Sequence, residues 1–207
     1  MKIIFYGDSI TDMGRYRDHA DGDVFTFGNG YVFLTAAELK YRFPGEYEII
    51  NKGISGNRIV DLYARIKADV WNLKPDMLSI LIGINDIWHE IGGGNGVDII
   101  RWEKVYRMLI EDTLKILPDL KIVIMEPFVL KGTATEGEFD RFLEVKEYAK
   151  VAKKIAEDYN CVFVPLQKEM DEYAAKYGAE KVLYDGVHPD IAGAKIISDA
   201  WLKTVIK

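Results

Sequence analysis

Five short apolar runs, separated by longer stretches with helical spacing, constrain the fold of this 207-residue chain more than any other feature. Within the runs, apolar residues follow one another almost without interruption, as in strands that are buried on both faces of a sheet. The alternation of strand and helix predicts a parallel sheet with helices on both faces. The predicted strands span residues 2–6, 47–50, 77–82, 121–125 and 161–164.

Apolar residues at helical spacing lie between and after these runs, and proline or glycine follows several of the stretches. The last helix should begin at Pro189, because proline suits the first turn of a helix. The segment from Gly92 to Gly96 predicts a mobile surface loop. Because the sequence shows no linker, repeat or low-complexity stretch, we expect a single domain over residues 1–207. The predicted helices span residues 31–41, 59–71, 102–117, 138–159, 166–177 and 189–205.

The chain carries a formal net charge of -6 at pH 7 and has one cysteine, Cys161. A negative charge argues against a nucleic-acid partner, because phosphate binding favours a basic surface. A single cysteine excludes an internal disulfide. The apolar stretch at the amino terminus is too short for the core of a signal peptide, and no run approaches the length of a membrane span. We therefore expect a cytoplasmic protein with no membrane partner.

Ser9 directly follows the first predicted strand, in the segment Gly7-Asp8-Ser9-Ile10-Thr11. A serine at that point lies at the carboxyl edge of the sheet, where open α/β sheets bind their ligands. Taken alone, the segment fits a helix-capping serine equally well.

Two further segments follow the second and third predicted strands. Gly56 lies in the first of them, and a glycine lets the backbone approach a ligand and present its N–H group. Asn85 lies in the second and offers a side-chain amide. Taken alone, each would be an ordinary turn residue.

Of the three histidines, only His188 combines a carboxylate three residues before it, Asp185, with a predicted helix start directly after it. A carboxylate so placed can hold the imidazole in one tautomer, with the other ring nitrogen directed outward. The alternative is an exposed capping aspartate beside a histidine without a partner.

These four segments converge if the sheet has the order 2-1-3-4-5, since strand 1 then lies between strands 2 and 3. Ser9 would lie between Gly56 and Asn85, and the segment before the last helix would bring Asp185 and His188 over it. This set suits acyl transfer, because a serine nucleophile needs a base. The developing oxyanion needs preorganised donors, which the N–H groups of Ser9 and Gly56 and the amide of Asn85 can supply.

In this order the four segments resemble the SGNH hydrolase family, also called the GDSL esterases and lipases. The four letters correspond here to Ser9, Gly56, Asn85 and His188, and the D-x-x-H block of the family matches Asp185. The resemblance covers the chain from the first strand to the last helix. It implies a three-layer, flavodoxin-like α/β fold with a five-stranded parallel sheet of order 2-1-3-4-5. It also implies a triad of Ser9, His188 and Asp185 that acts through an acyl-enzyme, and neither a metal nor an organic cofactor.

A narrower likeness lies in residues 7–12, 14–15, 30–32, 51–57 and 82–88, which look like the intracellular acetylxylan esterases of this family. That likeness implies a short acyl pocket, an acetylated sugar such as a xylo-oligosaccharide as substrate, and a homo-oligomer. The glycine-rich segment that follows, residues 92–96, lies beside the predicted site and could change what binds.

Four other residues are candidates for substrate binding. Trp88 and Tyr184 lie within a few residues of the site segments, and aromatic faces can stack on sugar rings, although core packing is the alternative. Asp8 neighbours Ser9 and would otherwise be a buried carboxylate that ties down the backbone. Arg15 could contact the substrate or pair with a neighbouring aspartate.

Several alternatives remain open at this point. Within the same chemistry, the chain could be a lipase, lysophospholipase or thioesterase, although it contains no apolar lid segment. From another class, it could be a non-catalytic flavodoxin-like binding module, but Asp8 and Asp12 make the loop after the first strand a poor phosphate site. A sugar-binding protein with an inert Ser9 is a third reading. His19 and His89 have carboxylates nearby but no metal-ligand spacing, so we expect no metal site.

Overall fold

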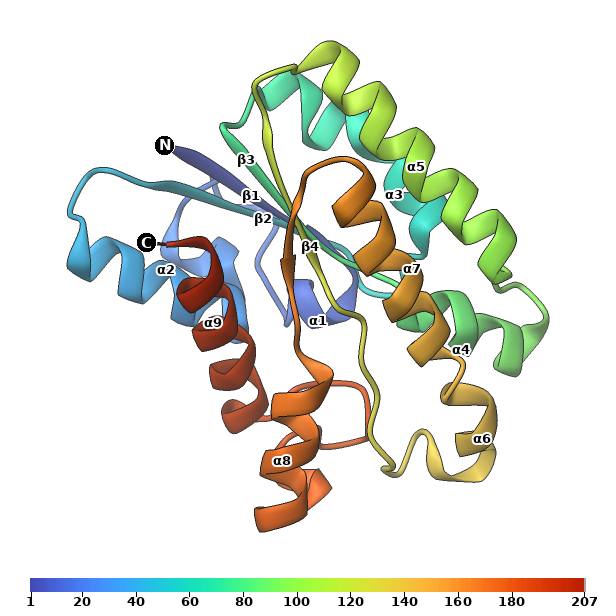
Figure 1. Ribbon diagram of the computed structural model, residues 1–207. Helices are drawn as coiled ribbons and strands as arrows, with labels where there is room; N and C mark the ends of the chain where they lie inside the picture. The colour runs from blue at the N-terminus through green and yellow to red at the C-terminus, as the bar shows by residue number, and fades with distance from the viewer. Residues whose placement is uncertain (207) are drawn as a thin grey trace.

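A five-stranded parallel sheet runs through the centre of the protein in the order β2-β1-β3-β4-β5 (Figure 1). The computed structural model describes residues 1–206. The α/β fold class and the strand order expected from the sequence are confirmed. The strands are β1 (Lys2–Gly7), β2 (Glu48–Gly53), β3 (Met77–Leu81), β4 (Lys121–Met125) and β5 (Val162–Val164).

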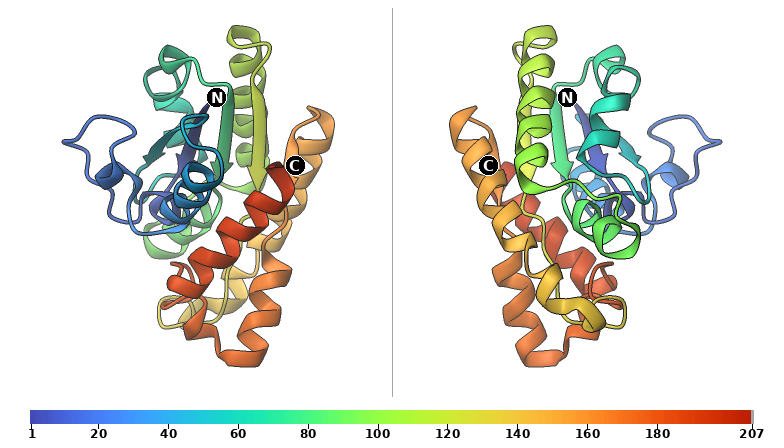
Figure 2. Two further views of the ribbon diagram at one scale, coloured as in Figure 1. Left: turned by 90° about the vertical axis from the view of Figure 1, so that its left-hand side faces the viewer. Right: turned by 90° about the vertical axis from the view of Figure 1, so that its right-hand side faces the viewer.

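Helices connect the strands and cover both faces of the sheet. The α-helices are α1 (Ser9–Asp12), α2 (Tyr31–Arg42), α3 (Ile59–Asp69), α4 (Ile84–Gly93), α5 (Ile99–Ile116), α6 (Phe139–Phe142), α7 (Val145–Asp158), α8 (Gln167–Tyr177) and α9 (Ile191–Val205). The 3-10 helices are η1 (Val24–Phe27), η2 (Trp71–Leu73), η3 (Glu136–Glu138) and η4 (Ala179–Lys181). Figures 1 and 2 show α2 and α9 together on one face, and α3, α5 and α7 on the other. No helix among residues 1–206 is both long and apolar enough to span a membrane.

The sequence of β1 is apolar without interruption because both faces of this central strand are buried. The ring of Phe5 faces α2 and α9, where it packs against Tyr31 and Trp201 with centroid separations of 5.7 and 5.2 Å. The side chain of Tyr6 faces the other way, and its hydroxyl donates a hydrogen bond of 2.6 Å to the carbonyl of Leu62 on α3. Both side chains are fully buried. Burying a side chain such as Phe5 stabilises the folded state by ~1.5–3 kcal/mol.

Helix α4 differs from the sequence-based expectation, because Gly92 and Gly93 lie inside it and not in a loop. Each glycine costs the helix ~1 kcal/mol relative to alanine. That cost is offset by Ile84, Ile87 and Ile91, which recur at helical spacing and pack against the core. Gly94 caps the end of the helix, because its left-handed backbone lets its N–H donate to the carbonyls of the preceding turn.

The last helix begins at Ile191, so the prediction that it begins at Pro189 is wrong. The side chain of Asp190 caps the helix by accepting a hydrogen bond of 2.8 Å from the Ile191 amide. Pro189 instead forms an antiparallel bridge with Leu183. The bridge closes the loop between these two residues, and this loop carries Asp185 and His188.

The helix expected over residues 138–159 is divided into η3, α6 and α7. At the junction of α6 and α7, the amides of Glu144 and Lys146 donate to carbonyls three residues earlier, whereas α-helical bonds span four. The break lets α6 pack against α4, where the ring of Phe142 meets that of Trp88 at a centroid separation of 5.8 Å.

Candidate active site

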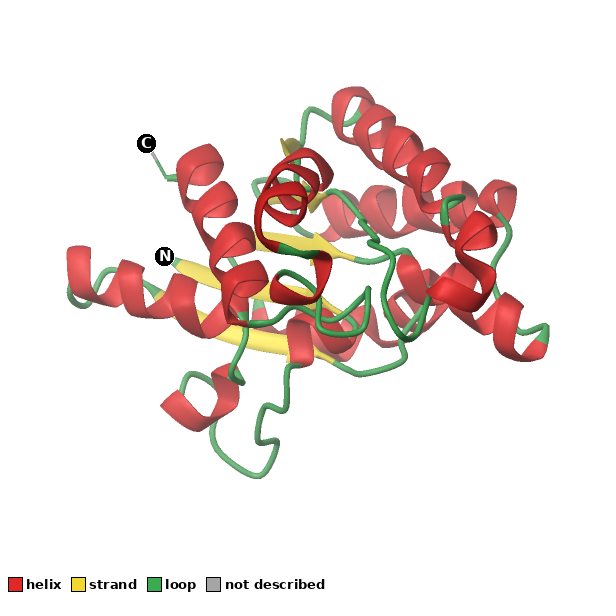
Figure 3. Cartoon of the chain, turned by 90° about the horizontal axis from the view of Figure 1, so that it is seen from below, coloured by secondary structure: helices red, strands yellow, loops and turns green. Residues whose placement is uncertain are grey.

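The carboxyl ends of β1, β2 and β3 finish level with one another, because Gly7 pairs with Gly53 on one side and Leu81 on the other. Figure 3 shows the protein from below, with loops close to the arrowheads that mark the carboxyl ends of the strands. Gly7 has no space for a side chain, since a Cβ atom would lie 2.4 Å from the carbonyl oxygen of Leu81. The serine that follows therefore leaves the sheet at a tightly packed point.

Ser9 is the first residue of α1 and follows β1 after a single residue, Asp8. One carboxylate oxygen of Asp8 accepts a hydrogen bond of 2.9 Å from the amide of Ile10 and so caps the short helix. The cap fixes the backbone on both sides of Ser9, which is half-buried.

A chain of hydrogen bonds runs from Asp185 through His188 to Ser9. The Nε2 atom of His188 lies 2.8 Å from the Ser9 hydroxyl oxygen, although the two residues are 179 positions apart. The Nδ1 atom of His188 lies 2.6 Å from one carboxylate oxygen of Asp185. The other oxygen accepts the amides of Val187 and His188 at 2.9 and 2.8 Å. This arrangement orients the imidazole and leaves Nε2 to accept the serine proton.

The pKa values of the two partners shift as expected for an ion pair that forms when the histidine is protonated. Burial by itself would raise the pKa of Asp185, but the hydrogen bonds from His188 and from the amide of Val187 hold that pKa below its usual value. The hydrogen bond to Asp185 raises the pKa of His188 above its ordinary 6.5, against partial burial that would lower it. A basic imidazole is what a weak serine nucleophile requires.

Gly56 and Asn85 line the same cleft, of about 590 Å³, as Ser9 and His188. Gly56 has a positive φ of 81°, a backbone conformation that favours glycine. The amide nitrogen of Asn85 donates a hydrogen bond of 3.2 Å to the carbonyl of Asn57. Because a side-chain amide has two N–H donors and Asn85 lines the cleft, a second donor is available to a ligand there.

Asp12 fixes the loop that carries Gly56. One of its carboxylate oxygens accepts hydrogen bonds from the amide and the hydroxyl of Ser55 at 3.1 and 3.2 Å. The same oxygen is paired with Arg17. The sequence left open whether Arg15 contacts the substrate or pairs with a neighbouring aspartate; in the structure the ion-pair partner of Asp12 is Arg17.

Arg65, on α3, is a supporting residue that the sequence reasoning missed. Its guanidinium donates to the carbonyls of Gly7 and Lys52 and to the side chain of Asn57 at 3.0, 2.9 and 2.7 Å. It thus joins the ends of β1 and β2 to the loop of Gly56. The sequence signal was weak, because an arginine within an amphipathic helix looks like any other surface charge.

Asp8 and Asp86 are buried carboxyls behind the site. Burial raises the pKa of Asp8 to about 7 and raises that of Asp86 well above its usual value. Each has one carboxylate oxygen that accepts a backbone amide and another that lacks a hydrogen-bond partner among residues 1–206. Asp86 binds the amide of Ile59 at 3.0 Å, and so ties the segment after β3 to the start of α3.

The four residues predicted to bind substrate occupy different places. Trp88 lines the cleft, and its ring lies 5.9 Å from that of His188. Tyr184 is exposed and stacks on His188 at a centroid separation of 5.7 Å and an angle of 15°. Asp8 is fully buried beneath the site. Arg15 does not line the cleft, and its Nε donates to the carbonyl of Gly53 at 2.8 Å.

The arrangement suits nucleophilic attack by a serine with an adjacent base and polar donors around the attacked carbonyl. Within the part of the chain that the structure describes, no cluster of three or more histidine, cysteine, aspartate or glutamate side chains could hold a metal ion.

Comparison with known proteins agrees with this chemistry. Residues 5–196 match the GDSL-like Lipase/Acylhydrolase family. The chain belongs to this family. It is a carboxylic ester hydrolase of the serine esterase type, and its substrates are small-molecule esters. It is 35% identical over 209 residues to the acetylxylan esterase of Geobacillus stearothermophilus, an alignment that covers 99% of this chain and 93% of that protein.

Solved structures of GDSL hydrolases share the fold. A protein from Parabacteroides merdae described as a GDSL-like lipase has a TM-score of 0.93 at 37% identity, over 98% of this chain and 94% of that one. The Geobacillus acetylxylan esterase has a TM-score of 0.89 at 34% identity, over 100% of this chain and 94% of that one. Further structures of that enzyme are of catalytic mutants in which a serine, an aspartate or a histidine is replaced by alanine. Its aspartate precedes its histidine by three positions, which is the spacing of Asp185 and His188 here.

Proposed function

We propose that this serine esterase removes acetyl groups from acetylated carbohydrate, such as xylo-oligosaccharides, and that Ser9, His188 and Asp185 form its catalytic triad. The observation that carries the proposal is the unbroken hydrogen-bonded chain from the Asp185 carboxylate through both nitrogens of His188 to the Ser9 hydroxyl. The name of the Geobacillus relative supports the acetyl and xylan parts.

In the first half of the proposed reaction, His188 accepts the proton of Ser9 as the serine oxygen attacks the ester carbonyl carbon. The negative charge that develops on the carbonyl oxygen is stabilised by the N–H groups of Ser9 and Gly56 and by the amide of Asn85. His188 then passes its proton to the alcohol oxygen, the carbon–oxygen bond of the ester breaks, and the alcohol leaves. Asp185 keeps the imidazole oriented and stabilises its protonated form.

In the second half, a water molecule takes the place of the alcohol. His188 accepts a proton from this water as the water oxygen attacks the acetyl group on Ser9. The proton returns to the serine oxygen when the tetrahedral intermediate breaks down, and acetate is released. No cofactor takes part in either half of the proposed reaction.

The acyl length and the sugar are tested by two substrate series. We expect kcat/KM for p-nitrophenyl esters to fall from acetate to octanoate, and we expect release of acetate from acetylated xylo-oligosaccharides. A preference for octanoate would contradict the acetyl assignment and favour a lipid or thioester substrate. Ester hydrolysis with no release of acetate from any acetylated sugar would contradict the carbohydrate assignment alone.

We also propose a homo-oligomer in the cytoplasm, built from a chain that forms one domain over residues 1–207. Exposed apolar side chains between α8 and α9 support self-association: Tyr177 and Ile191 are 50% and 81% exposed. Cys161 is the one cysteine of the sequence, which fits a reducing compartment. Sedimentation of the wild type and Ile191→Glu tests the assembly: a variant that sediments as a smaller species supports the proposal, and a monomeric wild type contradicts it.

A further inference from the structure

The cleft beside Ser9 extends along one face of α4. Asn85, Trp88, His89 and Gly92 all line it, and their spacing of three, four and seven residues places them on the same side of the helix. A helix rises 1.5 Å per residue, so this face extends ~10 Å from the amide of Asn85 to Gly92. The proposed reaction uses only the first part of this face, at Asn85.

His89 lies within this cleft, and the catalytic steps do not employ it. Its side chain is half-buried, and its Nε2 atom lies 4.0 Å from the point where a Cβ atom on Gly56 would stand. Among residues 1–206 its ring makes no hydrogen bond or ion pair with protein, whereas both ring nitrogens of His188 have partners. A half-buried imidazole that faces a cleft offers a donor and an acceptor to whatever binds there.

Gly92 and Gly93, which have no side chains, line the far end of the cleft. A Cβ atom on Gly92 or Gly93 would meet nothing within 4 Å, so these glycines leave space that side chains would otherwise fill. The neighbouring Asn95 is anchored by Arg58, whose Nη1 donates to the backbone and side-chain oxygens of Asn95 at 2.6 and 3.0 Å. This end of the cleft therefore has free space beside the glycines, and Arg58 holds the neighbouring backbone in place.

An acetyl group has two carbons, and the attack geometry confines it to the immediate surroundings of Ser9. The remaining length of the cleft is then left for the other half of the ester, the alcohol. The indole of Trp88, the imidazole of His89 and the free space at Gly92 suit a sugar. A sugar presents C–H groups on the faces of its ring and hydroxyls at its edge.

We infer that the cleft face of α4 binds the alcohol half of the ester, with His89 hydrogen-bonded to a hydroxyl group of that alcohol and Gly92 leaving room for an additional sugar unit. The inference rests on the proposed function, and it makes His89 a specificity-determining residue. The Nε2 or Nδ1 atom of His89 has a role only when the leaving alcohol carries a hydroxyl beyond the one esterified.

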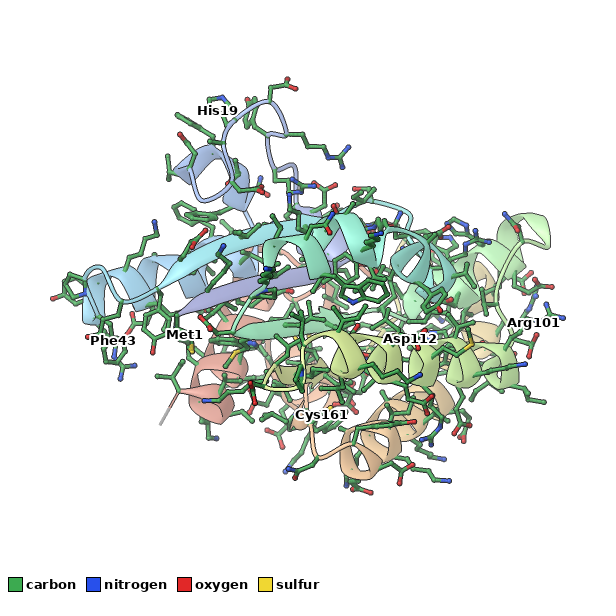
Figure 4. All side chains as sticks on the ribbon, turned by 90° about the horizontal axis from the view of Figure 1, so that it is seen from above. Met1, His19, Phe43, Arg101, Asp112 and Cys161 are labelled. Carbon is green, nitrogen blue, oxygen red and sulfur yellow. The ribbon has the colours of Figure 1, made fainter. Side chains whose placement is uncertain are left out.

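The test compares two acetate esters that share the acyl group and differ in the alcohol: p-nitrophenyl acetate and acetylated xylobiose. For His89→Ala we expect kcat/KM on acetylated xylobiose to fall about five- to tenfold, chiefly through KM, because one neutral hydrogen bond is lost. We expect less than a twofold change on p-nitrophenyl acetate. His89→Gln should restore much of the loss, since an amide also donates and accepts. The matched control is His19→Ala, which changes the histidine labelled on the protruding loop in Figure 4.

A second variant tests the open end without removing any polar group. Gly92→Phe places a ring in the cleft with no strain in the backbone, and it should lower kcat/KM more for acetylated xylotriose than for acetylated xylobiose. Gly137→Phe is its control, because Gly137 also faces open space but lies outside this cleft.

The outcomes separate this inference from the proposed function. Two results would overturn the inference: an equal loss of kcat/KM on both esters, or no loss of kcat/KM on the sugar ester in either His89→Ala or Gly92→Phe. The proposed function would still stand in both cases, provided that the wild type releases acetate from the acetylated sugar. A wild type that hydrolyses p-nitrophenyl acetate but no acetylated sugar would overturn the sugar part of the function and this inference with it.

Discussion

The two ends of the sheet carry hollows of similar size but of different chemistry. The hollow at the amino ends of the strands measures about 700 Å³, and the cleft at the carboxyl ends about 590 Å³. Figure 4 shows the protein from above and labels Met1, Phe43 and Cys161, which line that hollow. Burial raises the pKa of the Cys161 thiol to about 11, so it stays protonated and unreactive at neutral pH.

At the carboxyl end, by contrast, short hydrogen bonds link residues from distant parts of the chain. Ser9, Gly56, Asn85 and His188 come from four separate segments, and each follows a strand or precedes a helix. The comparison teaches that the size of a cavity says little about function. Convergence of polar groups at one edge, which parallel strands make possible, says much more.

The largest expected effect is that of Ser9→Ala. We expect kcat on p-nitrophenyl acetate to fall about 10⁵- to 10⁶-fold, because the nucleophile and the acyl-enzyme are both lost. Cys161→Ala at the opposite end should leave kcat within twofold of the wild type. The measurement is the steady-state rate of both variants, with circular dichroism to establish that they fold. Comparable losses of kcat in Ser9→Ala and Cys161→Ala would contradict the functional difference between the two ends of the sheet.

Asp185→Asn should lower kcat on the order of 10³- to 10⁴-fold, because the imidazole loses the group that holds its tautomer. The pH profile gives a second readout. His188 must be neutral to accept the serine proton, so kcat/KM of the wild type should fall as pH drops through a pKa above 6.5. Removal of the carboxylate lowers the pKa of His188, so in the variant the fall of kcat/KM should occur at lower pH. A fall at the same pH as in the wild type would show that Asp185 does not act through His188.

Asn85→Ala should reduce kcat about 10²- to 10³-fold, the usual cost of one lost oxyanion donor. KM should change little, because the hydrogen bond strengthens in the transition state. Asn72→Ala is the control, since that asparagine is exposed near the amino end of β3. A variant that loses activity through KM alone would indicate a role for Asn85 in substrate binding and not in stabilising the oxyanion.

The smallest effect concerns stability. Burial raises the pKa of Asp8 to about 7, so the folded state retains a proton that the unfolded chain releases at lower pH. This group therefore favours folding at low pH and opposes it as pH rises through about 7. Asp8→Asn removes that dependence, and its Tm relative to the wild type should rise by a few °C between about pH 5 and pH 8. An equal Tm difference at both pH values would show that Asp8 is already ionised in the folded protein.

Much of the fold was predictable because buried parallel strands leave a strong apolar signal. All five strands were found, and 121–125 was found to the residue. The proximity of Ser9, Asp185 and His188 was predictable for a related reason. The carboxyl ends of adjacent strands must meet, so residues that follow them can be placed together without coordinates.

The expected loop at Gly92 was wrong because tertiary packing overrode local preference. The glycines at 92 and 93 predict a loop, but the isoleucines of α4 bury enough surface to keep them helical. As a result, the sequence alone could not align His89 with Asn85 on one helix face. Arg65 was missed because the two partners that join it to the ends of β1 and β2 are backbone carbonyls, which carry no sequence signature.

The central claim is that Ser9 is the nucleophile and that His188 activates it. The direct measurement is to label the protein with a fluorophosphonate, digest it, and locate the adduct by mass spectrometry in the wild type, His188→Ala and Cys161→Ala. The account predicts one adduct per chain, on Ser9, which forms at the same rate in Cys161→Ala and very slowly in His188→Ala. An adduct on any other residue, or labelling of Ser9 at the same rate without His188, would contradict it.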